Sequence, residues 1–341
     1  MERQNILEVR GLKTHFKLYE GTLKAVEDVD FSVGVGRTLG IIGESGCGKS
    51  VTAHSILNTV QAPGKIVSGQ VFYRDARDEV VELTALPPNG GRIRSLRGRE
   101  ISMIFQEPMT SMAPVYTIGQ QMIGAYLTHQ PKRDHAAKAR ATERAKEMLA
   151  AVGMSDPTQR MNEYPHQLSG GMCQRAMIAL SLMLNPRILI ADEPTTALDV
   201  TVQAQIVDLL CGLKQRLGMT ILYITHDMGV IAGIADDLCV MYLGRIIEQG
   251  SARQIFHCPA HPYTVRLLRS IPNLGRKTPG ARLDAIRGNV PVPLDPKDEC
   301  GFCSRCDEMQ AGLCDSGVPG MVELEPGHFA RCVKLDGKRV G

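Results

Sequence analysis

The sequence predicts an α/β fold with a largely parallel sheet, because short apolar runs alternate along the chain with stretches of helical pattern. The expected strands are Thr38–Ile42, Ile101–Phe105, Ile188–Ala191 and Thr220–Thr225. The expected helices are Lys49–Leu57, Ala136–Val152, Met172–Leu184 and Val202–Leu217. A glycine-rich loop follows the first strand and an acidic pair follows the third, and both junctions carry chemistry that is argued below.

The end of this alternation has a different pattern. The apolar runs Leu238–Leu243 and Arg245–Gln249, separated by Gly244, predict an antiparallel hairpin. Prolines and cysteines then become frequent, so we expect a boundary near residues 255–275 and a small loop-rich appendage beyond it. The predicted domains are residues 1–255 and 256–341.

Composition excludes several classes of protein. The 341 residues include 39 Lys+Arg and 36 Asp+Glu, and a net charge of +3 argues against a dedicated nucleic-acid binder. A hydrophobic share of 43% and a charged share of 22% are typical of a folded chain. No apolar run approaches the roughly 18 residues of a membrane span, and no signal peptide is expected at the N-terminus. The 10 cysteines then indicate reduced thiols or metal ligands rather than disulfides.

The glycine-rich loop reads Gly43-Glu44-Ser45-Gly46-Cys47-Gly48-Lys49-Ser50, which is G-x-x-x-x-G-K-S between a strand and a helix. Its glycines let backbone N–H groups surround phosphate oxygens at a helix N-terminus. Lys49 is expected to reach the β- and γ-phosphates of a nucleotide, and Ser50 to bind Mg²⁺. The alternative is a chance glycine-rich turn, which the strand–loop–helix context disfavours.

The acidic pair follows the apolar run Ile188–Ala191. Asp192 at the strand end could hold Mg²⁺, and Glu193 could polarise the water that attacks the γ-phosphate. The alternative is a solvated acidic turn, and the phosphate loop makes it the weaker interpretation.

Further motifs resemble those of ABC transporter ATPases. The run Leu168-Ser169-Gly170-Gly171-Met172-Cys173-Gln174-Arg175 resembles the LSGGQ-type signature. Three other positions resemble the glutamine of the Q-loop, the D-loop and the switch histidine: Gln106, Ala197-Leu198-Asp199 and His226. The motifs stand in the family's order, and the resemblance covers residues 5 to about 255.

The resemblance implies a P-loop NTPase cassette with a RecA-like core, an antiparallel β subdomain and a helical subdomain over about 107–166, and it implies ATP and Mg²⁺ as cofactors. Glu193 would be the catalytic base, His226 would contact the γ-phosphate, and Gln106 would sense Mg²⁺ as a further ligand. Ser169, Gly170 and Gly171 would cover the phosphate loop of a second subunit in a head-to-tail ATP sandwich, with Asp199 at the interface. Tyr19 is expected to stack on adenine, with Phe16 as the alternative.

Other runs resemble the oligopeptide, dipeptide and nickel importer subfamily: Phe105–Met112, His261-Pro262-Tyr263-Thr264 and Ser270-Ile271-Pro272. The resemblance implies a peripheral ATPase at the cytoplasmic face of the inner membrane, in a binding-protein-dependent peptide importer. Its partners would be a paralogous second ATPase subunit, two transmembrane permease subunits and an extracytoplasmic solute-binding protein. A nickel-chelate or oligosaccharide importer, or an ABC ATPase without a channel, stays open.

Five cysteines gather in the appendage: Cys300, Cys303, Cys306, Cys314 and Cys332. The C-x2-C-x2-C spacing suits an iron–sulfur cluster or structural Zn²⁺. The subfamily's C-x4-R-C pattern implies a 4Fe–4S cluster on Cys300, Cys306, Cys314 and Cys332, with Cys303 as an alternate ligand. Free thiols and a ferredoxin-like electron carrier are the competing interpretations.

Two cysteines lie in the nucleotide motifs. Cys47 is expected to favour the thiolate, because backbone N–H groups and Lys49 surround it. Thiol alkylation would then inhibit the ATPase, whereas a shielded thiol would be inert. Cys173 stands where the subfamily usually has arginine.

Overall fold

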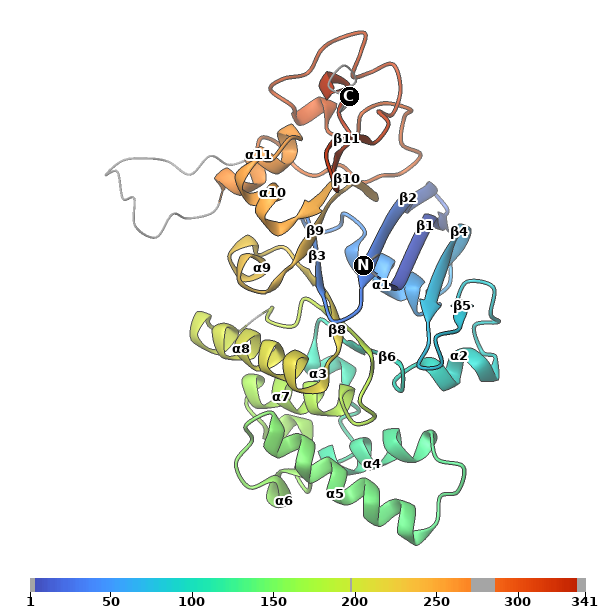
Figure 1. Cartoon of the computed structure of the whole chain (residues 1–341), viewed down its shortest axis with the longest axis vertical. Coiled ribbons are helices and arrows are strands. Elements are labelled where there is room, and N and C mark those ends of the chain that lie inside the picture. The colour runs from blue at the N-terminus through green and yellow to red at the C-terminus, as the bar shows by residue number, and fades with distance from the viewer. Residues whose placement is uncertain (1–3, 197, 271–285, 336–341) are drawn as a thin grey trace, which may run out of the picture. The chain divides into compact units, whose positions relative to one another are not determined.

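The computed structural model describes residues 4–196, 198–270 and 286–335 (Figure 1). These residues form two compact units. Unit 1 comprises the described parts of residues 1–74, 79–85 and 223–341, and unit 2 comprises those of 75–78 and 86–222. No helix within the described ranges is long and apolar enough to cross a membrane.

Unit 1 contains an antiparallel sheet in the order β2-β1-β4-β5. Its strands are β1 (Asn5–Leu18), β2 (Gly21–Gly34), β4 (Gly64–Arg74) and β5 (Val80–Glu82). β1 shifts register against both neighbours around Gly11, whose φ of +51° is the left-handed conformation that glycine adopts readily. Tyr19 lies in the tight turn between β1 and β2, so this turn projects from the end of the sheet.

The second sheet of unit 1 has the order β11-β12-β10-β9-β3. It comprises β3 (Thr38–Ile42), β9 (Asp237–Tyr242), β10 (Arg245–Ser251), β11 (Val322–Glu325) and β12 (His328–Ala330). β3 is buried along its whole length and pairs in parallel with β9. β9 and β10 form the predicted antiparallel hairpin through Leu243 and Gly244, both with positive φ.

Short helices complete unit 1. They are α1 (Lys49–Ile56), α9 (Met228–Ile234), α10 (Ala252–His257), α11 (Pro262–Arg269) and the 3₁₀ turns η2 (Cys303–Arg305) and η3 (Val333–Leu335). β11 and β12 come from the C-terminal region and pair through β12 with β10. The C-terminal region therefore extends the second sheet instead of folding apart from it.

Unit 2 contains the strand order β8-β7-β6, in which β6 and β7 are parallel. These strands are β6 (Ile101–Ile104), β7 (Ile188–Asp192) and β8 (Thr220–Thr225), whose last residues belong to unit 1. The helices are α2 (Gly91–Leu96), α3 (Pro108–Ser111), α4 (Ile118–Thr128), α5 (His135–Ala151), α6 (Pro157–Arg160), η1 (Pro165–Gln167), α7 (Gly170–Ser181) and α8 (Val200–Leu217).

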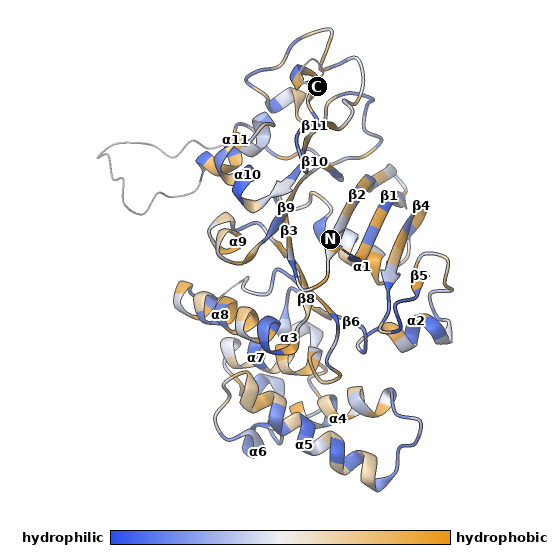
Figure 2. Cartoon of the chain, viewed as in Figure 1, coloured by the Kyte–Doolittle hydropathy of each residue, from blue (hydrophilic) through white to orange (hydrophobic). Residues whose placement is uncertain are grey.

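The long helices of unit 2 are amphipathic. In α5 the buried residues Ala137, Ala141 and Ala145 recur every four positions, so they form one apolar stripe. Hydrophilic and hydrophobic residues alternate in bands along α5 and α8 (Figure 2). The charged residues of α5 lie outside this stripe and are exposed or half-buried.

The predicted strands and helices are confirmed, with β3 and β8 matching residue for residue. The other predicted ends differ from the observed ones by at most three residues, as at α7, which begins at Gly170 and ends at Ser181. The segment 107–166 contains α3 to α6, and the predicted domain limits stay predictions.

Candidate active site

The phosphate loop joins β3 to α1 in unit 1, as the sequence predicts. Lys49 is buried, and its ammonium donates to the carbonyl oxygens of Gly43 (2.8 Å) and Glu44 (3.1 Å). A Cβ on Gly43 would lie 2.2 Å from the Met241 carbonyl oxygen. One on Gly48 would meet the Ala25 carbonyl oxygen at 2.1 Å. The motif therefore needs glycine at both positions because other backbone passes close by.

The tip of this loop faces solvent. Ser45 and Gly46 are exposed, Glu44 and Ser50 are half-buried, and Gly46 has a φ of +82°. The backbone of Thr52 donates to the Gly48 carbonyl oxygen at 2.9 Å, which closes the first turn of α1 behind the loop. A buried ammonium and exposed backbone N–H groups at a helix N-terminus suit a polyphosphate.

Cys47 does not fit the expected thiolate. Its side chain is 1% exposed and packs against Gly43. Burial raises the pKa of the Cys47 thiol, and the nearby Lys49 ammonium offsets this only in part. The expectation of a thiolate is therefore wrong, because the charged form would have to be buried.

The other candidates in unit 1 are Tyr19 and His226. Tyr19 is fully exposed at the β1–β2 turn, whereas Phe16 is half-buried with its ring against Gly64. His226 is exposed after β8, and Asp227 caps the following helix α9 through the N–H groups of Gly229 and Val230. Their assigned roles stay predictions.

Unit 2 brings Gln106 and the acidic pair together. Glu193 directly follows β7 and has a left-handed φ of +46°, and both Asp192 and Glu193 are buried. The Gln106 amide donates to a Glu193 carboxylate oxygen at 3.3 Å, and the Thr196 hydroxyl donates to the same oxygen at 3.0 Å. A buried carboxylate oriented by two donors is suited to positioning a water molecule.

The signature and D-loop residues lie at helix N-termini of unit 2. Ser169 caps α7 by accepting the Met172 N–H at 3.3 Å. A Cβ on Gly170 would meet no described atom within 4 Å apart from its chain neighbours and its own helix backbone. Gly171 packs against Val202. Asp199 caps α8 through the Val202 N–H at 3.0 Å, while Ala197 lies outside the described residues.

Cys173, two residues after Gly171 in the signature run, is buried beside Met112, with 3.8 Å between the two sulfurs. Burial raises the pKa of its thiol. The position therefore packs apolar surface.

The five tail cysteines line one small cavity in unit 1, together with His261 and Phe302. Burial raises the pKa of the Cys300 thiol to about 11 and raises the pKa of the thiols at Cys303, Cys306 and Cys332 as well. Within the described ranges, no three His, Cys, Asp or Glu side chains converge so as to hold a single metal ion.

The run His257-Cys258-x2-His261 has a spacing that resembles a metal site, but its residues have structural contacts instead. The His261 Nδ1 accepts the Tyr263 N–H at 3.0 Å and so caps α11. The backbone N–H groups of Ala260 and His261 each donate at 2.8 Å to the buried carboxylate of Glu248, which His328 also contacts. Cys258 is exposed and takes no part in these contacts. The contacts of Ala260 and His261 therefore hold the turn before α11.

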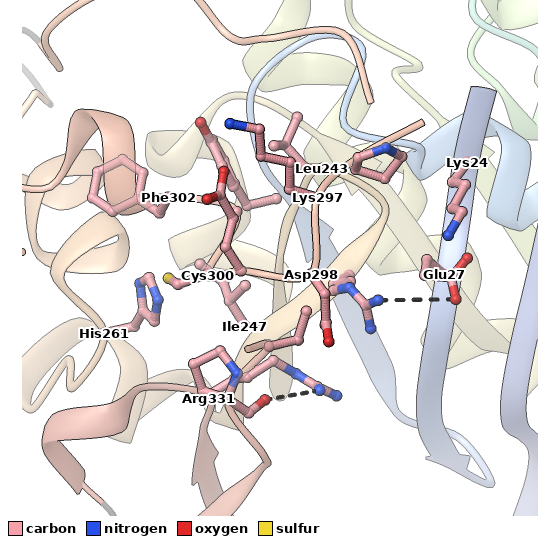
Figure 3. Close-up of a pocket in the computed structure, with 17 residues that line it drawn as sticks. Lys24, Glu27, Leu243, Ile247, His261, Lys297, Asp298, Cys300, Phe302 and Arg331 are labelled. Carbon is pink, nitrogen blue, oxygen red and sulfur yellow. Dashed lines mark hydrogen bonds and ion pairs between the residues drawn. The ribbon is translucent and has the colours of Figure 1, made fainter. Parts of the chain in front are cut away.

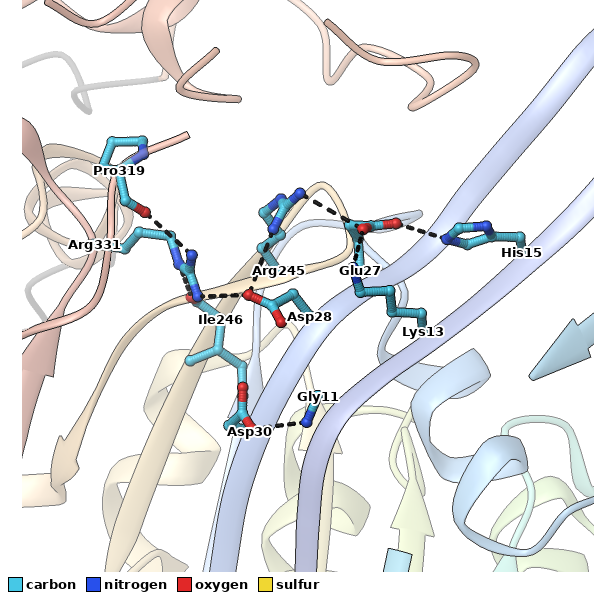
Figure 4. Close-up of polar contacts among 10 residues, drawn as sticks. All are labelled: Gly11, Lys13, His15, Glu27, Asp28, Asp30, Arg245, Ile246, Pro319 and Arg331. Carbon is cyan, nitrogen blue, oxygen red and sulfur yellow. Dashed lines mark hydrogen bonds and ion pairs between the residues drawn. The ribbon is translucent and has the colours of Figure 1, made fainter. Parts of the chain in front are cut away.

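A larger cavity of about 310 Å³ adjoins the cysteines. Figure 3 shows Cys300 and His261 at one end and Lys24 and Glu27, on β2, at the other. At that end Arg331 and Arg245 approach Asp28, at 3.6 and 3.9 Å, and Arg245 also approaches Glu27 (Figure 4). The Arg331 ion pair attaches the C-terminal region to β2, and the Arg245 ion pairs attach the β9–β10 hairpin to β2.

One ion pair next to the phosphate loop is not predicted by the sequence. Arg305, between Cys303 and Cys306, forms a two-point ion pair with Glu44 of the phosphate loop, at 2.8 and 3.1 Å. The C-x4-R-C pattern marked this arginine, but its partner lies 261 residues away and only the fold brings them together.

Comparison with known proteins agrees with this fold and these motifs. Residues 26–196 match the ABC transporter family, and residues 247–314 match the C-terminal region of oligopeptide/dipeptide transporters. The chain belongs to the ABC transporter ATPase family.

Its relatives match along nearly their whole length. A probable peptide ABC transporter ATP-binding protein of Sinorhizobium fredii is 46% identical over 96% of this chain and 94% of its own. The oligopeptide transport ATP-binding proteins AppD of Bacillus subtilis and OppD of Escherichia coli are 44% and 43% identical, over 96% of this chain and 96% and 93% of their own.

Solved structures show the same cassette fold. A dimeric ATP-binding cassette in a post-hydrolysis state, bound to ADP and phosphate, aligns with a TM-score of 0.63 at 25% identity, over 72% of this chain and 99% of its own. CbiO1 of Clostridium perfringens, part of an ABC transporter complex, aligns with a TM-score of 0.60 at 25% identity, over 77% and 93%.

Proposed function

We propose that this chain is the ATP-hydrolysing subunit of a binding-protein-dependent importer of dipeptides or oligopeptides. The observation that carries the proposal is the succession, in one chain, of an ABC cassette and the C-terminal region of oligopeptide/dipeptide transporters. The names of the relatives, which are peptide import or oligopeptide transport ATP-binding proteins, point the same way.

In unit 1, the phosphate loop binds the β- and γ-phosphates through Lys49 and backbone N–H groups. Tyr19 stacks on adenine, and His226 stabilises charge on the γ-phosphate. Buried Lys49 and glycines that leave no room for a Cβ support this assignment. Ser50 is proposed as a ligand of Mg²⁺, which neutralises phosphate charge when bound.

In unit 2, Glu193 orients and deprotonates the attacking water, and Gln106 holds the Glu193 carboxylate. The 3.3 Å contact between these two side chains supports their pairing. Asp192 and Gln106 are proposed as further Mg²⁺ ligands. Ser169, Gly170 and Gly171 present a helix N-terminus to the nucleotide of a second ATPase subunit, and Asp199 lies at that interface.

Glu193→Gln tests the enzymatic part. We expect the variant to bind ATP as the wild type does and to hydrolyse it on the order of a hundredfold more slowly, because the carboxylate no longer accepts a proton. Nucleotide affinity and phosphate release should be measured on the full chain. Unchanged hydrolysis would remove Glu193 from the reaction.

The transport part requires the assembly. We expect the chain to co-purify with two transmembrane permease subunits and a paralogous second ATPase subunit, peripheral to the cytoplasmic face of the membrane. The cognate extracytoplasmic binding protein should bind dipeptides or oligopeptides in calorimetry. If the binding protein binds only a nickel chelate or an oligosaccharide, that solute and not a peptide is the transported substrate. If the chain purifies without membrane subunits, a non-transport ABC ATPase is favoured.

We further propose that the tail cysteines hold a 4Fe–4S cluster through Cys300, Cys306, Cys314 and Cys332. One observation supports it: the five thiols line one cavity. The C-x2-C-x2-C spacing of the first three cysteines is also of a kind that suits a cluster. When bound, the cluster would cross-link a segment poor in regular structure.

Iron and sulfide content and visible absorbance of anaerobically purified protein test this proposal. We expect Cys306→Ser to lose the iron and Cys303→Ser, its neighbour in the same turn, to keep it. Zinc in place of iron would favour the single-ion alternative, and no metal in either preparation would leave the cysteines as free thiols. Loss of iron in Cys303→Ser would make Cys303 a ligand.

A further inference from the structure

The guanidinium of Arg305 uses all of its N–H groups in unit 1. Its side chain is 5% exposed. Besides the two bonds to Glu44, it donates to the Tyr242 hydroxyl at 3.2 Å. Its other bonds reach the carbonyl oxygens of Arg287 at 2.8 Å and Gly288 at 3.1 Å. A planar five-donor group satisfied in this way has one allowed orientation.

Glu44, the partner of Arg305, is fixed at three points. Its carboxylate accepts the two bonds from Arg305, and its backbone N–H donates to the Tyr263 hydroxyl at 3.0 Å. Its carbonyl oxygen accepts from the Lys49 ammonium and from the Cys47 N–H at 3.3 Å. The second residue of the phosphate loop is therefore held from the C-terminal region as well as from within the loop.

An aromatic cluster supports these polar contacts. The Phe302 ring packs edge-on against Tyr242 and Tyr263, with 5.4 Å between centroids in both pairs, and the two tyrosine rings are 4.7 Å apart. The Arg305 guanidinium also lies over the Tyr242 ring, 5.8 Å from its centroid. Phe302 and Arg305 flank Cys303, so the cysteine-bearing turn and the phosphate loop share one packed cluster.

We propose that Arg305 is a positioning residue for ATP, which holds Glu44 and neutralises its carboxylate so that the phosphate loop accepts a polyphosphate. The inference rests on the proposed function, since it assigns ATP to this loop. A carboxylate on a loop that binds several negative charges repels them unless a cation is paired with it. Arg305 supplies that cation from the turn that carries Cys303 and Cys306.

Through these contacts, the cysteine-bearing turn can control ATP binding. A change in the cysteine-bearing turn that withdraws Arg305 would leave Glu44 unpaired and weaken ATP binding without touching the motif residues. A purely structural role for Arg305 predicts instead that its loss lowers stability and leaves nucleotide affinity unchanged in the folded fraction.

The test measures binding of a fluorescent ATP analogue, and its KM in hydrolysis, with the full chain. Arg305→Ala is expected to raise the dissociation constant and KM about tenfold with a smaller change in kcat, because an unpaired carboxylate remains beside the phosphates. In a Glu44→Gln background, Arg305→Ala should change the constant less than about twofold, since no charge is left unpaired.

Arg331→Ala is the matched control. Arg331 is also a largely buried arginine of the C-terminal region, with its side chain 12% exposed, but it contacts Asp28, Ile246 and Pro319, away from the phosphate loop. We expect it to alter thermal stability and leave ATP affinity within about twofold. If Arg305→Ala does not fold, Arg305→Gln keeps an amide donor at the site and removes only the charge.

Either of two results from the single variants would overturn the inference: unchanged affinity in a folded Arg305 variant, or equal weakening by Arg331→Ala. Neither result concerns the proposed ATPase activity itself, which fails if the wild-type chain neither binds nor hydrolyses ATP. The inference also fails if Arg305→Ala weakens binding to the same extent with Glu44→Gln present, because Arg305 would then not act through Glu44.

Discussion

Burial decides the behaviour of the thiol in the phosphate loop. Sequence context placed Cys47 beside Lys49 and so favoured a thiolate, yet the side chain is 1% exposed and burial raises the pKa of its thiol. Desolvation outweighs one nearby cation because a buried anion loses its hydration on every side. Which of these effects dominates depends on packing of the loop against β9, and the local sequence does not encode that packing.

We expect a maleimide to modify Cys258, which is exposed, and to leave Cys47 unmodified in the folded chain. Labelling at neutral pH with mass spectrometry of the peptides would check this. The unfolded chain is the control, in which both thiols should react. Modification of Cys47 at the rate of Cys258 in the folded state would restore the thiolate expectation.

Glu27 on β2 predicts a pH dependence. Burial alone would raise the pKa of its carboxyl, but hydrogen bonds and charges from Lys13 and His15 outweigh it and hold the pKa below 4.5. The contacts are 3.0 Å to Lys13 and 2.6 Å to His15. The contribution of Glu27 to stability is therefore present above its unfolded-state pKa and is lost as pH falls through the lower folded-state pKa.

We expect Glu27→Gln to lower the free energy of unfolding by about 1 to 2 kcal/mol at pH 7. The difference from the wild type should shrink as pH falls through the lowered folded-state pKa of Glu27. Urea unfolding across a series of acidic pH values and at pH 7 is the measurement. Glu8→Gln, which breaks an exposed pair with Arg10, should leave the free energy of unfolding almost unchanged at every pH. A pH-independent difference for Glu27→Gln would contradict the argument.

At the scale of elements, buried strands were the most predictable features. β3 and β8 matched the sequence prediction because every residue in them is buried, so the apolar run and the strand coincide. β1 and β2 were not predicted as individual strands from the residue pattern. Register shifts around Gly11 interrupt the alternation of buried and exposed residues, and the pattern is lost there.

Two exposed N-cap residues, Ser169 and Asp134, allow a structural role to be told apart from a role in the nucleotide site. Ser169 at α7 and Asp134 at α5 both accept an N–H of the first turn, at 3.3 and 2.7 Å, and both are exposed. We expect Ser169→Ala and Asp134→Ala to cost about 1 kcal/mol of stability each. Only Ser169→Ala should reduce ATP hydrolysis, about tenfold, because only α7 is proposed to face a nucleotide.

Thermal unfolding and phosphate release of both variants would check this pair. The cap loss is matched, so any difference in activity reports on the nucleotide and not on the helix. If both variants hydrolyse ATP at the wild-type rate, Ser169 does not belong to the nucleotide site. If both variants lose the same share of activity, the loss of stability alone explains the effect.

At the scale of the whole chain, motif order identified the cassette, but not how the C-terminal region joins it. β12 pairs with β10, Arg331 approaches Asp28, and Arg305 binds Glu44. Each contact joins residues more than 75 positions apart, so no local pattern signals it. The candidate ATP residues could be named from spacing because their chemistry is local to short loops, whereas the residues that hold those loops could not.

The last prediction concerns assembly with a second ATPase subunit. The chain presents two incomplete parts of a nucleotide site: a phosphate loop with Ser45 and Gly46 exposed, and the exposed Ser169 and Gly170 at the start of α7. If each part serves a different subunit, a change in the signature must block dimer formation and leave ATP binding to the chain's own loop intact.

We therefore expect Glu193→Gln, which retains ATP, to form a dimer with the second ATPase subunit when ATP and Mg²⁺ are present, and Lys49→Ala to form none because it binds no ATP. Adding Ser169→Arg to Glu193→Gln should abolish the dimer and change ATP affinity less than about twofold, because an arginine at the helix N-terminus obstructs only the neighbour's nucleotide. Light scattering after gel filtration gives the mass, and the fluorescent analogue gives the affinity. A Ser169→Arg chain that loses its own ATP would instead place the signature over the loop of the same chain, and the head-to-tail arrangement would be wrong.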